Sequence, residues 1–243
     1  MGEARYNRQI LVEGIGNRGQ ERIRRGSVVL VGVGALGCAI AQQLVRAGIG
    51  SIRLIDADLP EISNLQRQVL IDELDVQRKI PKAIAAASKL ARANSEVIIE
   101  TRVERFGQLN GRELLAGADV VLDGTDNFQT RYLVNQFCVE LGIPWVFGGV
   151  LAMSGMSFPV LPGGPCLYCA LGPEPKQGSI PSTDQLGILA PTVATIASLE
   201  VVRAFKILIG TELETRLAIL DLEKESLRTV SIEKNPECPI CGN

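Results

Sequence analysis

The chain has 243 residues, 46% of them hydrophobic, and a formal net charge of -2. This length and composition suffice for one full α/β core, or for one domain with a small appendage. The interspersed charges give no basic surface that would indicate a nucleic-acid or membrane partner, and no apolar run is long enough to cross a bilayer. The first residues, MGEARYNRQ, contain no signal-peptide core, so we expect a cytoplasmic protein.

The predicted elements alternate between strands and helices. In chain order they are a strand over 28–31, a helix that begins in the glycine-rich turn, a strand over 51–56, a helix over 81–94, strands over 96–103 and 119–124, a helix over 127–142, a strand over 143–150, a helix over 190–210, and strands over 215–223 and 227–234. Residues 163–187 are expected to form a long loop.

This alternation predicts an α/β fold with a Rossmann-like, doubly wound and mostly parallel sheet, which C-terminal antiparallel strands extend. The sequence has no clean linker, so we expect a single domain over 1–243. In such folds the site lies at the carboxyl ends of the strands.

Gly32, Gly34 and Gly37 follow the first strand in the sequence GVGALG and open a helix. This is the dinucleotide-fold fingerprint, in which backbone N–H groups at a helix N-terminus bind phosphate. Asp56 ends the second strand, where a carboxylate can accept the ribose hydroxyls of an adenosine; an ordinary strand-end Asp is the alternative. The loop itself does not distinguish NAD from ATP.

Two further stretches place polar residues at the same edge of the sheet. DADLPEISNLQRQ departs from a dehydrogenase because it puts Asn64, Arg67 and Gln68 beyond the adenosine, where an arginine can face a polyphosphate. DGTDN follows the fourth strand and offers Asp126 as a magnesium ligand, while Asp123 is equally able to cap the next helix. The residues alone do not decide between these readings.

Four of the six cysteines form two Cys-x-x-Cys turns, which are Cys166 with Cys169 and Cys238 with Cys241. Four thiolates suit one tetrahedral structural zinc ion. Two redox dithiols or four buried thiols remain open from the local pattern, because the gap between the pairs exceeds the usual zinc-finger spacing.

The other two cysteines, Cys38 and Cys138, are expected to be buried and inert. Histidine is absent from the chain, so any mechanism has to work without imidazole.

The sequence contains RYNRQI over 5–10, GVGALGC, DADLPEISNLQRQ, the Pro-Lys pair at 81–82, DGTDN and the two cysteine pairs. Together these motifs resemble the MoeB/ThiF/HesA family, the relatives of ubiquitin-activating enzymes. The resemblance covers nearly the whole chain. It implies that Mg-ATP binds the glycine loop and that AMP is transferred to the C-terminal glycine carboxylate of a ubiquitin-like sulfur-carrier protein, with release of pyrophosphate. Such carriers end in Gly-Gly and serve molybdopterin, thiamin or tRNA thiolation. An attacking carboxylate is already ionised near pH 7 and needs no base, which agrees with the missing histidine.

The resemblance also implies a role for particular residues. The nucleotide-binding set is Gly32, Gly34, Gly37, Asp56, Asp58, Asn64, Arg67, Gln68, Lys82 and Asp126. The catalytic set is Arg8, Arg67, Lys82 and Asp126, in which Asp126 holds Mg²⁺ and Arg8 is lent to the neighbouring subunit of a homodimer. The four paired cysteines hold zinc. Residues 1–150 form the nucleotide-binding half, and residues 151–243 form the carrier-binding half with the zinc site and a crossover loop.

Two positions depart from the family pattern. The segment before Lys82 is two residues longer than the family leads us to expect, so Lys79 could take its place. Thr183 stands where many members carry a cysteine in the crossover loop, and a hydroxyl with no base beside it is a poor nucleophile. We therefore expect adenylation without covalent transfer at this position.

Three other functions remain to be weighed. The same chemistry can act on a small-molecule or tRNA-linked carboxylate. An NAD-dependent oxidoreductase would need a proton donor, and without histidine the candidates are few. A silent nucleotide-binding scaffold is disfavoured by the presence of Asp126 and Arg67.

Overall fold

The computed structural model describes residues 2–176 and 178–242, and their strands form one mixed sheet with the order β3-β2-β1-β4-β5-β6-β7-β8. The strands are β1 (Ser27–Val31), β2 (Ser51–Ile55), β3 (Ile98–Arg102), β4 (Val120–Asp123), β5 (Trp145–Leu151), β6 (Ser154–Val160), β7 (Arg216–Asp221) and β8 (Ser226–Ser231).

Strands β1 to β5 are parallel, and β1 lies between β2 and β4. The chain proceeds from β1 outward to β2 and β3 and then returns to β4 on the other side of β1. This reversal of strand order creates a crevice at the carboxyl ends of β1 and β4, where ligands bind in doubly wound sheets. The predicted parallel sheet is confirmed.

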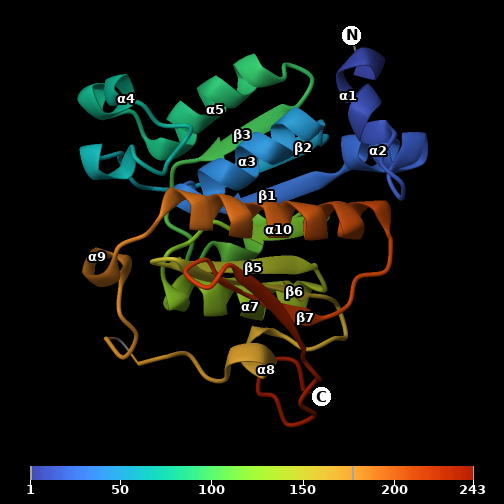
Figure 1. Cartoon of the computed structure of the whole chain (residues 1–243), viewed down its shortest axis with the longest axis vertical. Helices are drawn as coiled ribbons and strands as arrows, with labels where there is room; N and C mark the ends of the chain where they lie inside the picture. Colours follow the sequence, from blue (N-terminus) through green and yellow to red (C-terminus); the bar gives the residue numbers. More distant parts are fainter. Residues whose placement is uncertain (1, 177, 243) are drawn as a thin grey trace.

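Helices cover both faces of the parallel strands (Figure 1). Helices α3 (Ala35–Ala47), α5 (Lys82–Ala93) and α10 (Ala190–Ile209) pack on one face, and α6 (Gly111–Leu115) and α7 (Phe128–Leu141) pack on the other. The long helix α10 lies directly against α3.

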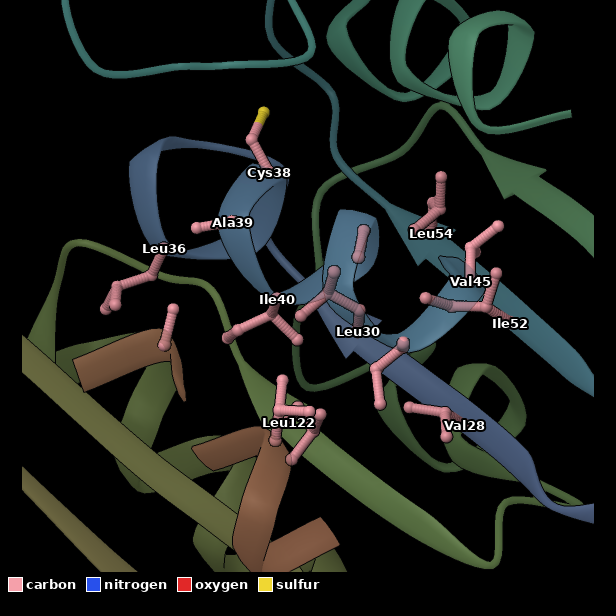
Figure 2. Close-up of a cluster of buried hydrophobic side chains, with 14 of the residues drawn as sticks. Val28, Leu30, Leu36, Cys38, Ala39, Ile40, Val45, Ile52, Leu54 and Leu122 are labelled. Carbon is pink, nitrogen blue, oxygen red and sulfur yellow. The ribbon is translucent and has the colours of Figure 1, made fainter. Parts of the chain in front are cut away.

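The core beneath α3 is built by helical periodicity. Leu36, Ile40 and Leu44 recur every four residues and are buried, so this side of the helix faces the sheet. Figure 2 shows Ile40 directed at Leu30 and Leu122 of the strands below it. This packing fixes the N-terminus of α3 against the end of β1.

The C-terminal half continues the sheet with antiparallel strands, as predicted. Strand β6 was not expected, because its sequence SGMSFPV is poor in strand-forming residues. Its pairing with β5 along seven residues and with β7 on its other edge overrides that local preference.

Several short helices lie outside the predicted elements. The expected loop over 163–187 contains α8 (Leu167–Leu171) and α9 (Thr183–Leu186). The others are α1 (Gly2–Ile10), α2 (Gly16–Arg25), the 3-10 helix η1 (Ile62–Asn64), α4 (Glu73–Arg78) and α6. Within residues 2–176 and 178–242, no helix has both the length and the apolar character that crossing a membrane requires.

Candidate functional site

The glycine loop packs tightly between β1 and β4. Gly32 has a φ of +91°, and a Cβ there would lie 2.6 Å from the carbonyl carbon and oxygen of Gly124. A Cβ on Gly37 would overlap the carbonyl oxygen of Gly32. Larger residues would therefore separate the loop from the end of β4, and the N-terminus of α3 would lose its position at the crevice.

Asp56 is tied to this loop. Its Oδ2 accepts the backbone N–H of Val33 at 2.7 Å, and its Oδ1 accepts the backbone N–H of Asp58 at 2.8 Å. Burial raises the pKa of Asp56 from its ordinary value, while the two N–H donors and the charge of Lys82 favour the ionised form. The carboxylate thus lies at the end of β2 beside the glycines.

Lys82, rather than Lys79, lies at this edge of the sheet. Lys82 is the first residue of α5, its side chain is buried, and its Nζ lies 3.3 Å from Oδ2 of Asp58. Its backbone N–H also donates to the carbonyl of Asp58. Lys79 is the exposed, left-handed residue that ends α4. The longer segment is thus accommodated in the turn before Pro81.

Asn64, Arg67 and Gln68 lie in and just after η1. Oδ1 of Asn64 accepts the backbone N–H of Glu61, which caps the short helix. Nε2 of Gln68 lies 3.9 Å from the position that a Cβ on Gly34 would take, and its Oε1 has no hydrogen-bond partner among the described residues. The buried amide of Gln68 therefore adjoins the glycine loop.

Arg67 is a partly exposed residue, and its guanidinium donates to the carbonyl of Ser63 at 2.8 Å. Among the described residues, no carboxylate lies within ion-pair distance of it. A positive charge that no anion balances at this edge suits a polyphosphate ligand.

Asp123 and Asp126 occupy different environments. Asp123 is buried, and its carboxylate binds Arg131 Nε at 3.0 Å and the backbone N–H and hydroxyl of Thr125. Asp126 is exposed in the turn that follows β4. The suggestion that Asp123 caps the next helix is wrong, because Asn127 does so by accepting the N–H of Thr130.

Arg131 is a site residue that the sequence did not single out. Besides binding Asp123, it donates to the carbonyl of Thr125 at 2.8 Å and lies over the ring of Phe128. It thereby fixes the Asp123–Asp126 turn from the α7 side. Burial raises the pKa of Asp123, and the Arg131 charge opposes that shift.

The structure does not bring Arg8 to the other expected residues. It is exposed on α1, which packs through Tyr6 against Gly48 at the C-terminus of α3. The glycine loop is at the other end of α3, so the length of that helix, about 20 Å, separates the two. Arg8 therefore lies outside the group of expected site residues in its own chain.

The four paired cysteines converge, although corresponding cysteines of the two turns are 72 positions apart in the sequence. Sγ of Cys166 lies 3.6 Å from that of Cys238, and Sγ of Cys169 lies 3.4 Å from that of Cys241. All four sulfurs lie within 4.8 Å of one another. Tetrahedral zinc with Zn–S bonds near 2.3 Å needs S···S distances of about 3.8 Å, so this donor set fits that ion.

Cys38 and Cys138 are buried within the two faces of the core. Burial raises the pKa of Cys38 to about 12, so the thiol stays protonated and its Sγ donates to the carbonyl of Val33. This agrees with the expectation of inert thiols.

The fold and these groups define the class of E1-like nucleotide-binding proteins, and comparisons with known proteins agree. Residues 6–240 match the model of the ThiF family. The chain belongs to this family and is an adenylyltransferase.

Two curated relatives show how far the similarity extends. The chain is 41% identical over 242 residues to the sulfur carrier protein ThiS adenylyltransferase of Bacillus subtilis, covering 98% of this chain and 71% of that protein. It is 40% identical over 247 residues to the sulfur carrier protein adenylyltransferase of Thermus thermophilus, covering 98% and 90%. The crystal structure of E. coli MccB with ATP has a TM-score of 0.85 at 23% identity, covering 98% of this chain and 75% of that one, and establishes likeness of fold.

Proposed function

We propose that the protein activates the C-terminal carboxylate of a small ubiquitin-like sulfur-carrier protein that ends in Gly-Gly. ATP supplies AMP, pyrophosphate leaves, and the carrier becomes an acyl adenylate ready to accept sulfur for cofactor or tRNA thiolation in the cytoplasm. The names of the Bacillus and Thermus relatives support this choice of substrate. The observation that carries the proposal is the proximity of the glycine loop to Asp56, Lys82 and Gln68 at one edge of the sheet.

The N-terminal half, residues 1–150, would bind ATP. Backbone N–H groups at the α3 N-terminus, after Gly34, would face the phosphates. The N–H groups of Gly32 and Val33 donate instead to the carbonyl of Ile55 and to Asp56, which fixes the shape of the loop. Asp56 accepts the ribose hydroxyls, because its acceptor lone pairs are not exhausted by the N–H groups of Val33 and Asp58.

The polyphosphate would lie over Asn64, Arg67, Gln68 and Lys82. Asp58 supports the nucleotide indirectly, by holding the Lys82 ammonium in place before the anion arrives. Arg67 and Lys82 stabilise the extra negative charge that develops on the α-phosphate oxygens. The catalytic power then comes from alignment and charge, as is usual for transfer at phosphorus.

The carrier carboxylate attacks the α-phosphorus; the new carboxylate O–P bond forms as the P–O bond to pyrophosphate breaks. No proton has to be removed from the nucleophile, since a carboxylic acid is ionised near pH 7. Asp126 is the residue that would hold Mg²⁺, which neutralises phosphate charge when bound. Its exposure at the end of β4 suits an ion that keeps several waters.

A homodimer would complete the site. Arg8 lies about the length of α3 from the glycine loop of its own chain, so its proposed contact with ATP requires a second copy. In such a dimer, the ATP site of each subunit would lack its arginine unless the second subunit supplied Arg8.

The C-terminal half, residues 151–243, would bind the body of the carrier. Cys166, Cys169, Cys238 and Cys241 would hold a structural zinc ion that pins the segment after β8 to α8. Thr183 begins α9 with no histidine in the chain to activate it, which supports adenylation without a covalent carrier intermediate here.

The test is ATP–pyrophosphate exchange with Mg²⁺, run on the protein alone and with each Gly-Gly-ended carrier from the same genome. We expect exchange only with a cognate carrier. Exchange with none of them despite ATP binding would overturn the proposed substrate and favour a small-molecule or tRNA-linked carboxylate. Absence of ATP binding would overturn the proposal as a whole.

A further inference from the structure

Glu200 is a buried carboxyl group that the proposed mechanism does not use. It lies in α10, its side chain is inaccessible to solvent, and neither carboxyl oxygen has a hydrogen-bond partner among the described residues. A carboxyl group in such a position is costly to bury, so its place in the fold calls for a reason.

The Glu200 side chain occupies the space that a glycine leaves on one face of the sheet. Gly148 lies in β5 with its missing side-chain position directed toward α10, and a Cβ there would collide with the Glu200 carboxyl. Alternation along the strand sends Phe147 to the α7 face and Val146 to the α10 face. The carboxyl group thus rests on the backbone of β5 from the α10 side.

The charged groups around Glu200 come from three elements. They are Asp123 on β4, Arg131 on α7 and Arg203 one turn along α10. Arg203 is directed away, because it donates to Ser157 Oγ and to the carbonyl of Arg216. Arg131 binds Asp123 instead.

Burial without a hydrogen-bond partner among the described residues favours the protonated, neutral form of the Glu200 carboxyl group. Burial raises the pKa of Glu200 well above its ordinary value, and the negative charge of Asp123 raises it further, while the positive charges of Arg131 and Arg203 oppose this shift. No cation is positioned to pair with an ionised Glu200 in the described part of the chain.

The backbone of β4 and β5 beside Glu200 is connected to the glycine loop. Asp123 and Gly148 lie next to each other, since the N–H of Gly148 points at Asp123 Oδ2 at 3.5 Å. Gly124 follows Asp123 in the chain, and its carbonyl packs against Gly32. We call the contact between Asp123 of β4 and Gly148 of β5 the β4–β5 junction. A displacement of the backbone there would reach the glycine loop through Asp123 and Gly124.

We propose that Glu200, as a neutral acid, is a positioning residue that holds the β4–β5 junction against the glycine loop, and that its ionisation weakens ATP binding. The inference rests on the proposed ATP site. An ionised carboxyl would be a second anion beside Asp123, so Arg131 would be drawn from the Thr125 turn or the junction would open to water.

The first measurement is the Kd for Mg-ATP by calorimetry between about pH 7 and pH 9, for the wild type, Glu200→Gln and the control Glu212→Gln. Gln keeps the shape and neutrality of the protonated side chain. Glu212 is exposed in the turn after α10, so Glu212→Gln makes the same chemical substitution at a site that does not contact β4 or β5. We expect wild type and Glu212→Gln to lose affinity by up to about tenfold per pH unit once Glu200 ionises, and Glu200→Gln to change less than about twofold beyond ATP's own titration.

Unfolding gives a readout that does not involve ATP. Between the unfolded pKa near about 4.3 and the raised folded pKa, the folded state binds a proton that the unfolded state lacks, so the free energy of unfolding falls as pH rises. Glu200→Gln removes this slope. Its Tm should therefore exceed that of the wild type at pH 8 by more than it does at pH 5.

A third variant tests the contact itself. Glu200→Ala leaves a cavity against Gly148, and we expect its Kd for ATP to rise about tenfold at pH 7, while Gln at this position restores the wild-type value.

Each result bears on one statement. If Tm depends on pH in the same way in wild type and Glu200→Gln, the statement that Glu200 is protonated in the folded protein is overturned. If the Kd for ATP depends on pH in the same way in both, the effect of Glu200 on the ATP site is overturned, while ATP binding itself stands. A wild type that does not bind ATP at any pH would instead overturn the proposed function.

Discussion

The Asp56 carboxylate accepts the backbone N–H of Val33 at 2.7 Å, which joins the end of β2 to the loop that follows β1. One carboxylate thus has two tasks, since the ribose of the proposed nucleotide would use the same group. Asn keeps one oxygen and cannot accept all of these hydrogen bonds.

We therefore predict that Asp56→Asn raises the Kd for ATP by about tenfold to a hundredfold, as expected for hydrogen bonds to a charged group. Asp119→Asn is the matched control, because Asp119 accepts the backbone N–H of Ser27 at 2.8 Å at the opposite end of β1. Calorimetric titration with ATP checks both. Equal losses of affinity in the two variants would mean that Asp56 acts on stability alone.

Arg67→Ala should lower ATP–pyrophosphate exchange by about 10² to 10³, because it removes one stabiliser of the charge that develops on phosphate. Arg67 contacts a backbone carbonyl and not a carboxylate, so its loss should leave Tm almost unchanged. Arg78→Ala, an exposed arginine at the end of α4, is the control. Near-wild-type exchange in Arg67→Ala would remove this residue from the catalytic set.

Asp126→Asn should lower exchange at least about a hundredfold and shift its Mg²⁺ dependence to higher concentration, because the amide is a weaker ligand for a hard cation. A titration of exchange against Mg²⁺ measures both effects. The control is Glu96→Gln, at an exposed position after α5 and before β3. An unchanged Mg²⁺ midpoint would show that the ion is held elsewhere.

Zinc content should be about one atom per chain in protein prepared without chelators. Cys238→Ser should lose the metal and lower Tm by more than about 5 °C, since the segment after β8 loses its attachment to α8. Elemental analysis and thermal unfolding are the measurements. Cys138→Ala should keep the metal, because that buried thiol of α7 is not one of the four converging sulfurs. Less than about half an atom of zinc per wild-type chain would contradict the site.

Mixing subunits tests the role of Arg8. In the proposed homodimer, Arg8→Ala and Asp126→Asn would each be inactive alone, whereas a heterodimer formed after mixing would contain one complete site. Random reassortment should restore about a quarter of wild-type exchange. If the two variants stay inactive after subunit exchange, verified by native mass spectrometry, Arg8 does not act across a dimer.

Local sequence pattern was sufficient where local chemistry decides the structure. The β-branched strand 28–31, the glycines after it and the periodic apolar face of α3 all specify one arrangement without distant contacts. Asp56 could be placed because a strand end is a defined point on the sheet. Lys82 could not be separated from Lys79, because the turn before α5 is set by the contact of Lys82 with Asp58.

The missed features depend on partners that are distant in sequence. Strand β6 exists because β5 and β7 both pair with it. Glu200 looks like one polar position in a helix, and its burial follows from the absence of a side chain at Gly148. The consecutive glycines 148 and 149 within a strand were the available signal, since glycine in a strand often marks a close approach.

The separation of the two cysteine turns also bears on how the chain matures. Cys166 and Cys169 emerge from the ribosome well before Cys238 and Cys241, and β7 and β8 are made in between. A nascent chain that has only the first pair offers two thiolates and cannot enclose the ion. Capture of the proposed zinc ion would therefore follow synthesis of β7 and β8, whereas β1 and β4 can pair before the last two cysteines are made.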